Sequence, residues 1–143
     1  MRYFSKEEAD RMVPYLQRTF EGIRARSSEL ARLSHLLRRQ GDRSPPFTPV
    51  PDELAEGHRL LRKQRDREMR KIQEAFHTLG EVGVHVKRGD GQVDFLSKRG
   101  DRRVVLCWEF GEPAVDHWHE LDAGEGERQP ISRPDAFGPH YVN

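Results

Sequence analysis

Hydrophobic residues recur at helical spacing through the first half of the chain. They form a narrow stripe among mostly charged and polar positions, and part of it repeats every seven residues. This stripe consists of Leu16, Phe20, Ile23, Leu30, Leu33 and Leu37. A second stripe, from about Asp52 to Leu79, consists of Leu54, Leu61, Met69, Ile72, Phe76 and Leu79. The pattern predicts two long helices.

The residues around these stripes predict where the helices begin and end. Ser5 is placed to cap the first helix, and Glu8 to return a hydrogen bond to the backbone of the cap. Pro14 has no amide hydrogen, so we expect a break that leaves a short, kinked N-terminal helix. The segment 41–51, rich in proline, predicts a loop, and Gly80 predicts the end of the second long helix.

Short alternating segments separated by turn residues follow Gly83 and predict β-strands. The expected strands lie at 84–87, 93–96, 104–110 and 115–121. We therefore expect an α+β fold in a single domain of residues 1–143. Its expected parts are a long antiparallel helical hairpin (5–80) that includes the kinked helix, a small antiparallel sheet of three to four strands (83–123) and a C-terminal loop or arm (124–143).

Composition and charge narrow the class of protein. Hydrophobic and charged residues each make up 34% of the chain, which is typical of long solvated helices. The net charge is +1, but residues 1–80 hold 17 Lys and Arg against 12 Asp and Glu, and residues 81–143 hold 8 against 12. We expect the two halves to neutralise each other. With one Cys, no leader-like start and no long apolar run, we expect a cytoplasmic protein without a membrane partner.

The rarest side chains gather between residues 106 and 124, which include the single Cys and both Trp residues. His117 and His119 share one face of an expected strand, and two imidazoles on one face can bind a divalent metal. Cys107, Glu120 and Asp122 complete this candidate metal site, and a contribution from Cys107 would favour zinc. The spacing of these ligands matches no diagnostic zinc motif.

The turn before His117 decides what shares the histidine face. A three-residue loop of 111–113 places Cys107 opposite His117 and gives a patch of potential ligands. A four-residue loop that includes Ala114 places Trp108 opposite His117 and makes the face largely apolar. The alternative to a metal site is a buried histidine bonded to a carboxylate, beside a buried and inert cysteine.

The helices suggest interaction rather than catalysis. Polar residues dilute both hydrophobic stripes, so two helices alone would be marginal and would recruit another surface. We expect a non-enzymatic interaction or oligomerisation module, first of all a homodimer, with another protein partner as an option. Basic residues on the helices, concentrated in 59–71, raise nucleic-acid binding as a further alternative, which the interleaved acidic residues and the small net charge disfavour.

The overall pattern resembles a family of small bacterial proteins that is catalogued as a domain of unknown function. The resemblance rests on short motifs spread over nearly the whole length, which are 3–9 with Pro14, 93–95, 106–108, 111–113, 118–124 and 128–130. Members are sometimes labelled as cell-division coiled-coil proteins. The resemblance implies no established activity, cofactor or site residue.

Overall fold

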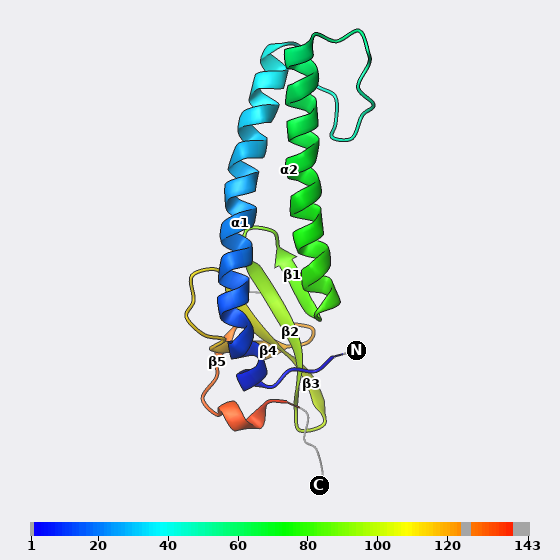
Figure 1. Cartoon of the computed structure of the whole chain (residues 1–143). Coiled ribbons are helices and arrows are strands. Elements are labelled where there is room, and N and C mark those ends of the chain that lie inside the picture. The colour runs from blue at the N-terminus through cyan, green and yellow to red at the C-terminus, as the bar shows by residue number, and fades with distance from the viewer. Residues whose placement is uncertain (1, 124–126, 139–143) are drawn as a thin grey trace. The chain divides into compact units, whose positions relative to one another are not determined.

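The computed structural model describes residues 2–123 and 127–138. The elements are α1 (Lys6–Arg39), α2 (Glu56–Glu81), β1 (Val84–Arg88), β2 (Gln92–Arg99), β3 (Arg102–Glu109), β4 (His117–Glu120), β5 (Gln129–Pro130) and a short 3-10 helix (Pro134–Ala136) (Figure 1). The strands form one antiparallel sheet in the order β1-β2-β3-β4-β5. The predicted α+β class is confirmed, with five strands in place of the expected three to four.

β5 is the strand that the sequence did not predict. It lies in the expected C-terminal arm, parts of which (124–126 and 139–143) are outside the described residues. His117 pairs with Pro130 and Trp118 with Gln129. Two residues, one of them a proline, are too short for an alternating pattern, and proline is tolerated there because β5 is an edge strand.

Contacts divide the chain into two compact units, which we describe separately. The sheet unit comprises residues 1–20 and 78–143, and the helical unit comprises residues 21–77. α1 contributes its first part to the sheet unit and the rest to the helical unit. The single domain and the antiparallel hairpin over residues 5–80 stay predictions.

The core of the sheet unit lies between the first turns of α1 and one face of the sheet. Phe4 packs edge-to-face on Phe95 with the ring centroids 5.0 Å apart, and Phe20 lies 6.2 Å from Trp108. The same sheet face carries a row of paired residues, Phe95, Leu106 and Trp118, which are buried. We call it the inner face, and alternation along each strand assigns the intervening residues to an outer face.

The predicted cap of the first helix is confirmed, but the predicted break is wrong. Ser5 Oγ accepts a hydrogen bond from the Glu8 amide at 3.0 Å, and Glu8 Oε1 accepts one from the Ser5 amide at 3.0 Å. α1 then runs unbroken through Pro14. Pro14 is exposed, whereas Val13 and Leu16 on either side of it are buried. A proline inside a helix costs about 3 kcal/mol, and the packing of both turns on the sheet outweighs this cost.

α2 begins and ends later than the sequence predicted. It starts at Glu56 rather than at Asp52, and it continues through Gly80 to Glu81. Gly83, whose φ is 89°, follows the helix in a left-handed conformation that favours glycine. Among the described residues, no helix is both long and apolar enough to cross a membrane.

The helical unit buries few apolar side chains. Those that are buried are Ile23, Leu33, Leu37 and Ile72. The larger apolar side chains of α1, α2 and the loop that stay half-buried include Leu30, Leu36, Leu54, Leu61, Met69 and Phe76. An ion pair between Arg26 Nη1 and Glu68 Oε2 at 3.1 Å joins the two helices within this unit. Its interior is therefore thin and partly polar.

Candidate functional site on the outer face of the sheet

A row of polar side chains crosses the outer face of the sheet. Backbone pairing places His85 opposite Asp94, Asp94 opposite Cys107 and Cys107 opposite His117, so the row spans β1 to β4. His119 pairs with Val105 in the adjacent row. The structure therefore shows the register of the first alternative, in which Cys107 and not Trp108 pairs with His117, but residues 110–116, and not a three-residue loop, separate β3 from β4.

Two residues of the predicted metal site lie elsewhere. Glu120 is on the opposite side of β4 from the histidines, where its Oε1 pairs with Arg102 Nη2 at 3.1 Å. Asp122 is exposed in the turn after β4. Among the described residues, no three side chains of the His, Cys, Asp or Glu types are grouped closely enough to hold a metal ion. Side chains alternate between the two faces along β4, so Glu120 lies away from the histidines although it is their neighbour in the sequence.

Asp94 and His119 form a buried carboxyl–imidazole pair. The imidazole is 4% exposed, its Nδ1 lies 2.7 Å from the carbonyl oxygen of Glu120, and its Nε2 lies 3.8 Å from Asp94 Oδ1. The short contact to a carbonyl assigns a proton to Nδ1. Asp94 Oδ1 is buried and has no hydrogen-bond partner among the described residues. Burial raises the pKa of the Asp94 carboxyl, and the positive charge of Lys87 and the neighbouring histidines opposes that shift.

Cys107 is buried beneath a basic side chain from the C-terminal segment. Arg128 Nε lies 3.1 Å from Cys107 Sγ, and Arg128 Nη2 donates to Glu112 Oε1 at 2.9 Å. Burial raises the pKa of the Cys107 thiol, and the guanidinium of Arg128 opposes this shift. Cys107 is therefore a protonated thiol at neutral pH and lacks the activation of a catalytic nucleophile.

Glu112 connects this cluster to His117. Its Oε2 lies 3.5 Å from His117 Nδ1, a buried atom without a hydrogen-bond partner among the described residues. The other carboxylate oxygen, Oε1, also accepts a hydrogen bond from the Glu109 amide at 2.6 Å. Glu112 and Arg128 together tie the turn after β3 and the segment before β5 to the outer face.

The sequence did not identify Asp94, Glu112, Arg128 or His85 as neighbours of the histidines. A usable signal existed for Asp94. The two-residue turn of Gly100 and Asp101 pairs Arg99 with Arg102, and counting back along both strands from that turn places Asp94 opposite Cys107. No comparable signal locates Arg128, because its position depends on a long connection after β4.

Replacing Asp94 by asparagine is expected to raise the melting temperature at pH 7. The fold disfavours the charged carboxylate, because burial raises the pKa of Asp94, and the neutral amide removes that cost. The folded protein binds this proton more tightly than the unfolded chain does, so the cost disappears as the pH falls towards about 4. Thermal unfolding between these pH values should therefore show the two proteins converging. The exposed change Asp101→Asn is the control, and an Asp94→Asn variant that is less stable at pH 7 would contradict the assignment.

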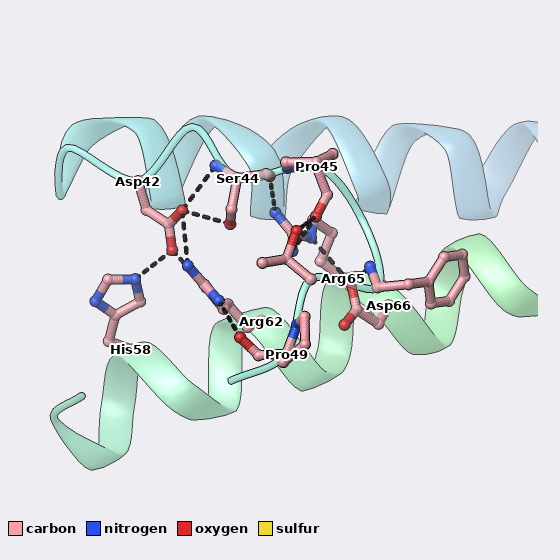
Figure 2. A network of polar contacts seen from close by, with 10 residues as sticks. Asp42, Ser44, Pro45, Pro49, His58, Arg62, Arg65 and Asp66 are labelled. Carbon is pink, nitrogen blue, oxygen red and sulfur yellow. Dashed lines mark hydrogen bonds and ion pairs between the residues drawn. The ribbon is translucent and has the colours of Figure 1, made fainter. Parts of the chain in front are cut away.

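A second polar cluster lies inside the helical unit and fixes the loop between its helices (Figure 2). Asp42, which is 8% exposed, is at its centre. Its Oδ2 accepts from Arg62 Nε at 2.7 Å and lies 2.6 Å from His58 Nε2, while its Oδ1 accepts from the Ser44 amide at 2.9 Å. The Arg62 guanidinium, with the hydrogen bonds from Ser44 and His58, holds the pKa of Asp42 well below its usual range.

Arginine side chains of α2 also bind loop carbonyls directly. Arg62 Nη1 donates to the carbonyl of Pro49 at 3.1 Å, and Arg65 Nη1 donates to that of Ser44 at 2.7 Å. Arg65 is 3% exposed, and its Nη2 donates to the carbonyl of Pro45 at 3.3 Å. Each guanidinium thus satisfies backbone groups that this loop would otherwise leave without partners. The sequence indicated a loop here but not this network.

Comparison with known proteins adds a family but no activity. A family model described as an uncharacterized conserved protein matches residues 2–131. No curated protein and no solved structure matches the chain. The matched range includes both the outer-face row and the loop cluster.

Proposed function

The chain belongs to DUF2203, a family of uncharacterized conserved proteins, and from that starting point we propose that it is a non-enzymatic interaction protein that self-associates through its helical unit. The observation that carries this proposal is the thin interior of residues 21–77, which buries four apolar side chains together with three charged ones. The buried charged residues are Asp42, Arg62 and Arg65. The protonated state of Cys107 also favours a role without covalent catalysis.

A second copy of the chain is the partner that the helical unit fits best. Half-buried leucines at positions such as Leu30 and Leu36 would become fully covered, and each square ångström of apolar surface removed from water contributes about 25 cal/mol. Leu16, Ile23 and Leu37, three of the four residues at the sevenfold spacing along α1, are buried within the chain, so the apolar surface open to a second copy lies beside them, at Leu30 and Leu36. A homodimer is the simplest assembly of this kind. We place it in the cytosol, where a free thiol such as Cys107 stays reduced.

Sedimentation velocity and light scattering test the self-association. We expect a mass of twice 16.7 kDa that falls to the monomer mass on dilution. Leu36→Glu should shift the equilibrium towards the monomer while the circular dichroism spectrum is retained. Leu121→Glu introduces the same charge at a leucine of the sheet unit that is 49% exposed, and it should leave the dimer intact. A monomer at all concentrations would refute self-association.

Metal binding by the outer face is the second candidate function. Asp94 Oδ1 and His117 Nδ1 favour it, since both atoms are buried on one face without hydrogen-bond partners among the described residues. His119 and Cys107 would add donors after side-chain rotation, and a thiolate contribution would select zinc. Elemental analysis of untagged protein tests this candidate. Absence of stoichiometric metal, with a melting temperature unchanged by added zinc, would exclude it.

A further inference from the structure

One face of α2 carries a continuous set of basic side chains, which we call the basic stripe and which consists of Arg59, Lys63, Arg67, Arg70 and Lys71. At about 100° per residue they fall within about a third of the helix circumference. The buried residues Arg65 and Ile72 lie on the opposite side of the helix. Lys63, Arg67 and Arg70 are exposed, whereas Arg59 and Lys71 at the edges of the stripe are half-buried, so the centre of the stripe faces away from the interior of the helical unit.

The acidic residues of the helical unit leave the stripe without neutralising partners. Asp42 pairs with Arg62, Asp66 with Arg65, and Glu68 with Arg26. Throughout residues 21–77, all of which the structure describes, no ion pair involves a residue of the stripe. In the sequence, the acidic residues between these basic positions count against a polyanionic partner. In the structure, most of them form ion pairs with other arginines. Net charge for the whole chain conceals this local excess of positive charge.

The surface beside the stripe is hollowed. A depression of about 470 Å³ is lined by Lys63, Asp66, Arg67, Arg70, Lys71 and Glu74. Four of its six lining residues are basic, so an extended anion can contact several cations at once. Asp66, one of the two acids, is also bonded to the loop, because its Oδ1 accepts from the amide of Phe47 at 3.0 Å.

Phe47 is held in an unusual conformation next to the stripe. Phe47 is 44% exposed, and its φ of 68° is the single positive value for a non-glycine residue among the described residues. Such a backbone costs about 1–2 kcal/mol and persists because its surroundings impose it. The bonds from Arg65 to Ser44 and Pro45 fix the loop just before it. The guanidinium of Arg70 lies 5.8 Å from the ring centroid, so the ring belongs to the same surface as the stripe.

We propose that the basic stripe and Phe47 form a binding surface for single-stranded nucleic acid. The cations of Lys63, Arg67 and their neighbours contact successive phosphates, and an unpaired base stacks on the exposed ring of Phe47. An exposed aromatic side chain adds nothing to the binding of a duplex backbone or an acidic peptide, which is why the observations favour a single strand. The proposal rests on the interaction role proposed above and names its partner, but it does not require self-association.

Fluorescence anisotropy with labelled single-stranded RNA and DNA of about 12 nucleotides tests the surface on the full-length protein. If five phosphates are neutralised, the logarithm of the association constant should fall against the logarithm of salt concentration with a slope of about −3.5. The combined change Lys63→Glu and Arg67→Glu should weaken binding at least about tenfold and reduce the slope to about −2. The same charge change at Arg103 and Arg133, which are exposed in the sheet unit, should leave affinity unchanged.

Phe47→Asn isolates the contribution of stacking, since asparagine tolerates the left-handed backbone that this position requires. We expect about tenfold weaker binding to single strands and no change in binding to a heparin probe, which has no bases. The melting temperature of each variant verifies its fold. Duplex DNA bound as tightly as single strands, polyglutamate bound equally well, or an equal loss in the Arg103 and Arg133 variant would each overturn the proposal. A dimer that binds no oligonucleotide would overturn it while leaving the proposed self-association in place.

Discussion

Trp108→Ala is expected to lower the free energy of unfolding by about 4 kcal/mol, the largest loss for a single change in the sheet unit. The indole is completely buried and lies 6.2 Å from the ring of Phe20 and 6.4 Å from that of Phe110. Its Nε1 also donates to the carbonyl of Glu112 at 2.9 Å. Truncation leaves a cavity between helix and sheet and removes the shorter of two hydrogen bonds to that carbonyl, which also accepts from Gln17 Nε2 at 3.5 Å. Urea unfolding followed by circular dichroism measures the loss.

Trp108→Phe separates the two contributions, because it keeps most of the packing and removes the hydrogen bond. We expect it to cost about 1–2 kcal/mol. A change below about 1 kcal/mol for the alanine variant would show that helix and sheet do not depend on this contact. The same result would place the main core of the unit elsewhere, around Phe4 and Phe95.

Asp42→Asn is expected to destabilise the helical unit by about 3 kcal/mol at neutral pH. It leaves the buried guanidinium of Arg62 without its carboxylate and weakens the contacts to Ser44 and His58. Because Arg62 holds the pKa of Asp42 below its usual range, the stabilisation is present above about pH 4 and is lost as the pH falls further. Thermal unfolding of both proteins across that range should show their difference shrinking in acid.

The matched control is Asp52→Asn, a change at an exposed carboxylate of the same loop that should have little effect. Arg62→Met and the double variant complete a mutant cycle, in which the coupling should account for most of the loss caused by either single change. Equal losses at pH 7 and in acid would rule out the ionised carboxylate as the source of the stabilisation.

Local chemistry in the sequence was sufficient for much of the fold. The reciprocal hydrogen bonds of Ser5 and Glu8 depend on residues three positions apart, so their types alone predict them. The same local reasoning failed at Pro14, because burial of Val13 and Leu16 against the sheet decides the outcome there. Helix propensity can be judged from the residues of one segment, whereas the packing that overrides it depends on a second segment that is distant in the sequence.

The candidate site was predictable in part for a related reason. Both histidines and Cys107 were correctly placed on one face once the register of β3 and β4 was known, but the sequence left two registers open. Counting back from the two-residue turn between β2 and β3 would have placed Asp94 opposite Cys107. No such count locates Arg128, since 21 residues separate it from the Cys107 that it contacts. Adding Glu120 and Asp122 to the ligands gave sequence proximity more weight than strand alternation allows.

Because arginines of α2 anchor the loop, we expect residues 42–66 to change together between related proteins. Deleting part of the loop would remove the carbonyls of Ser44, Pro45 or Pro49 and leave a buried guanidinium of α2 without its acceptor. Loops of this length usually vary freely between related proteins, because few side chains depend on them. Here a change in loop length would have to be accompanied by changes at Arg62 and Arg65. A chimera between two members of the family should therefore exchange the loop and the start of α2 together.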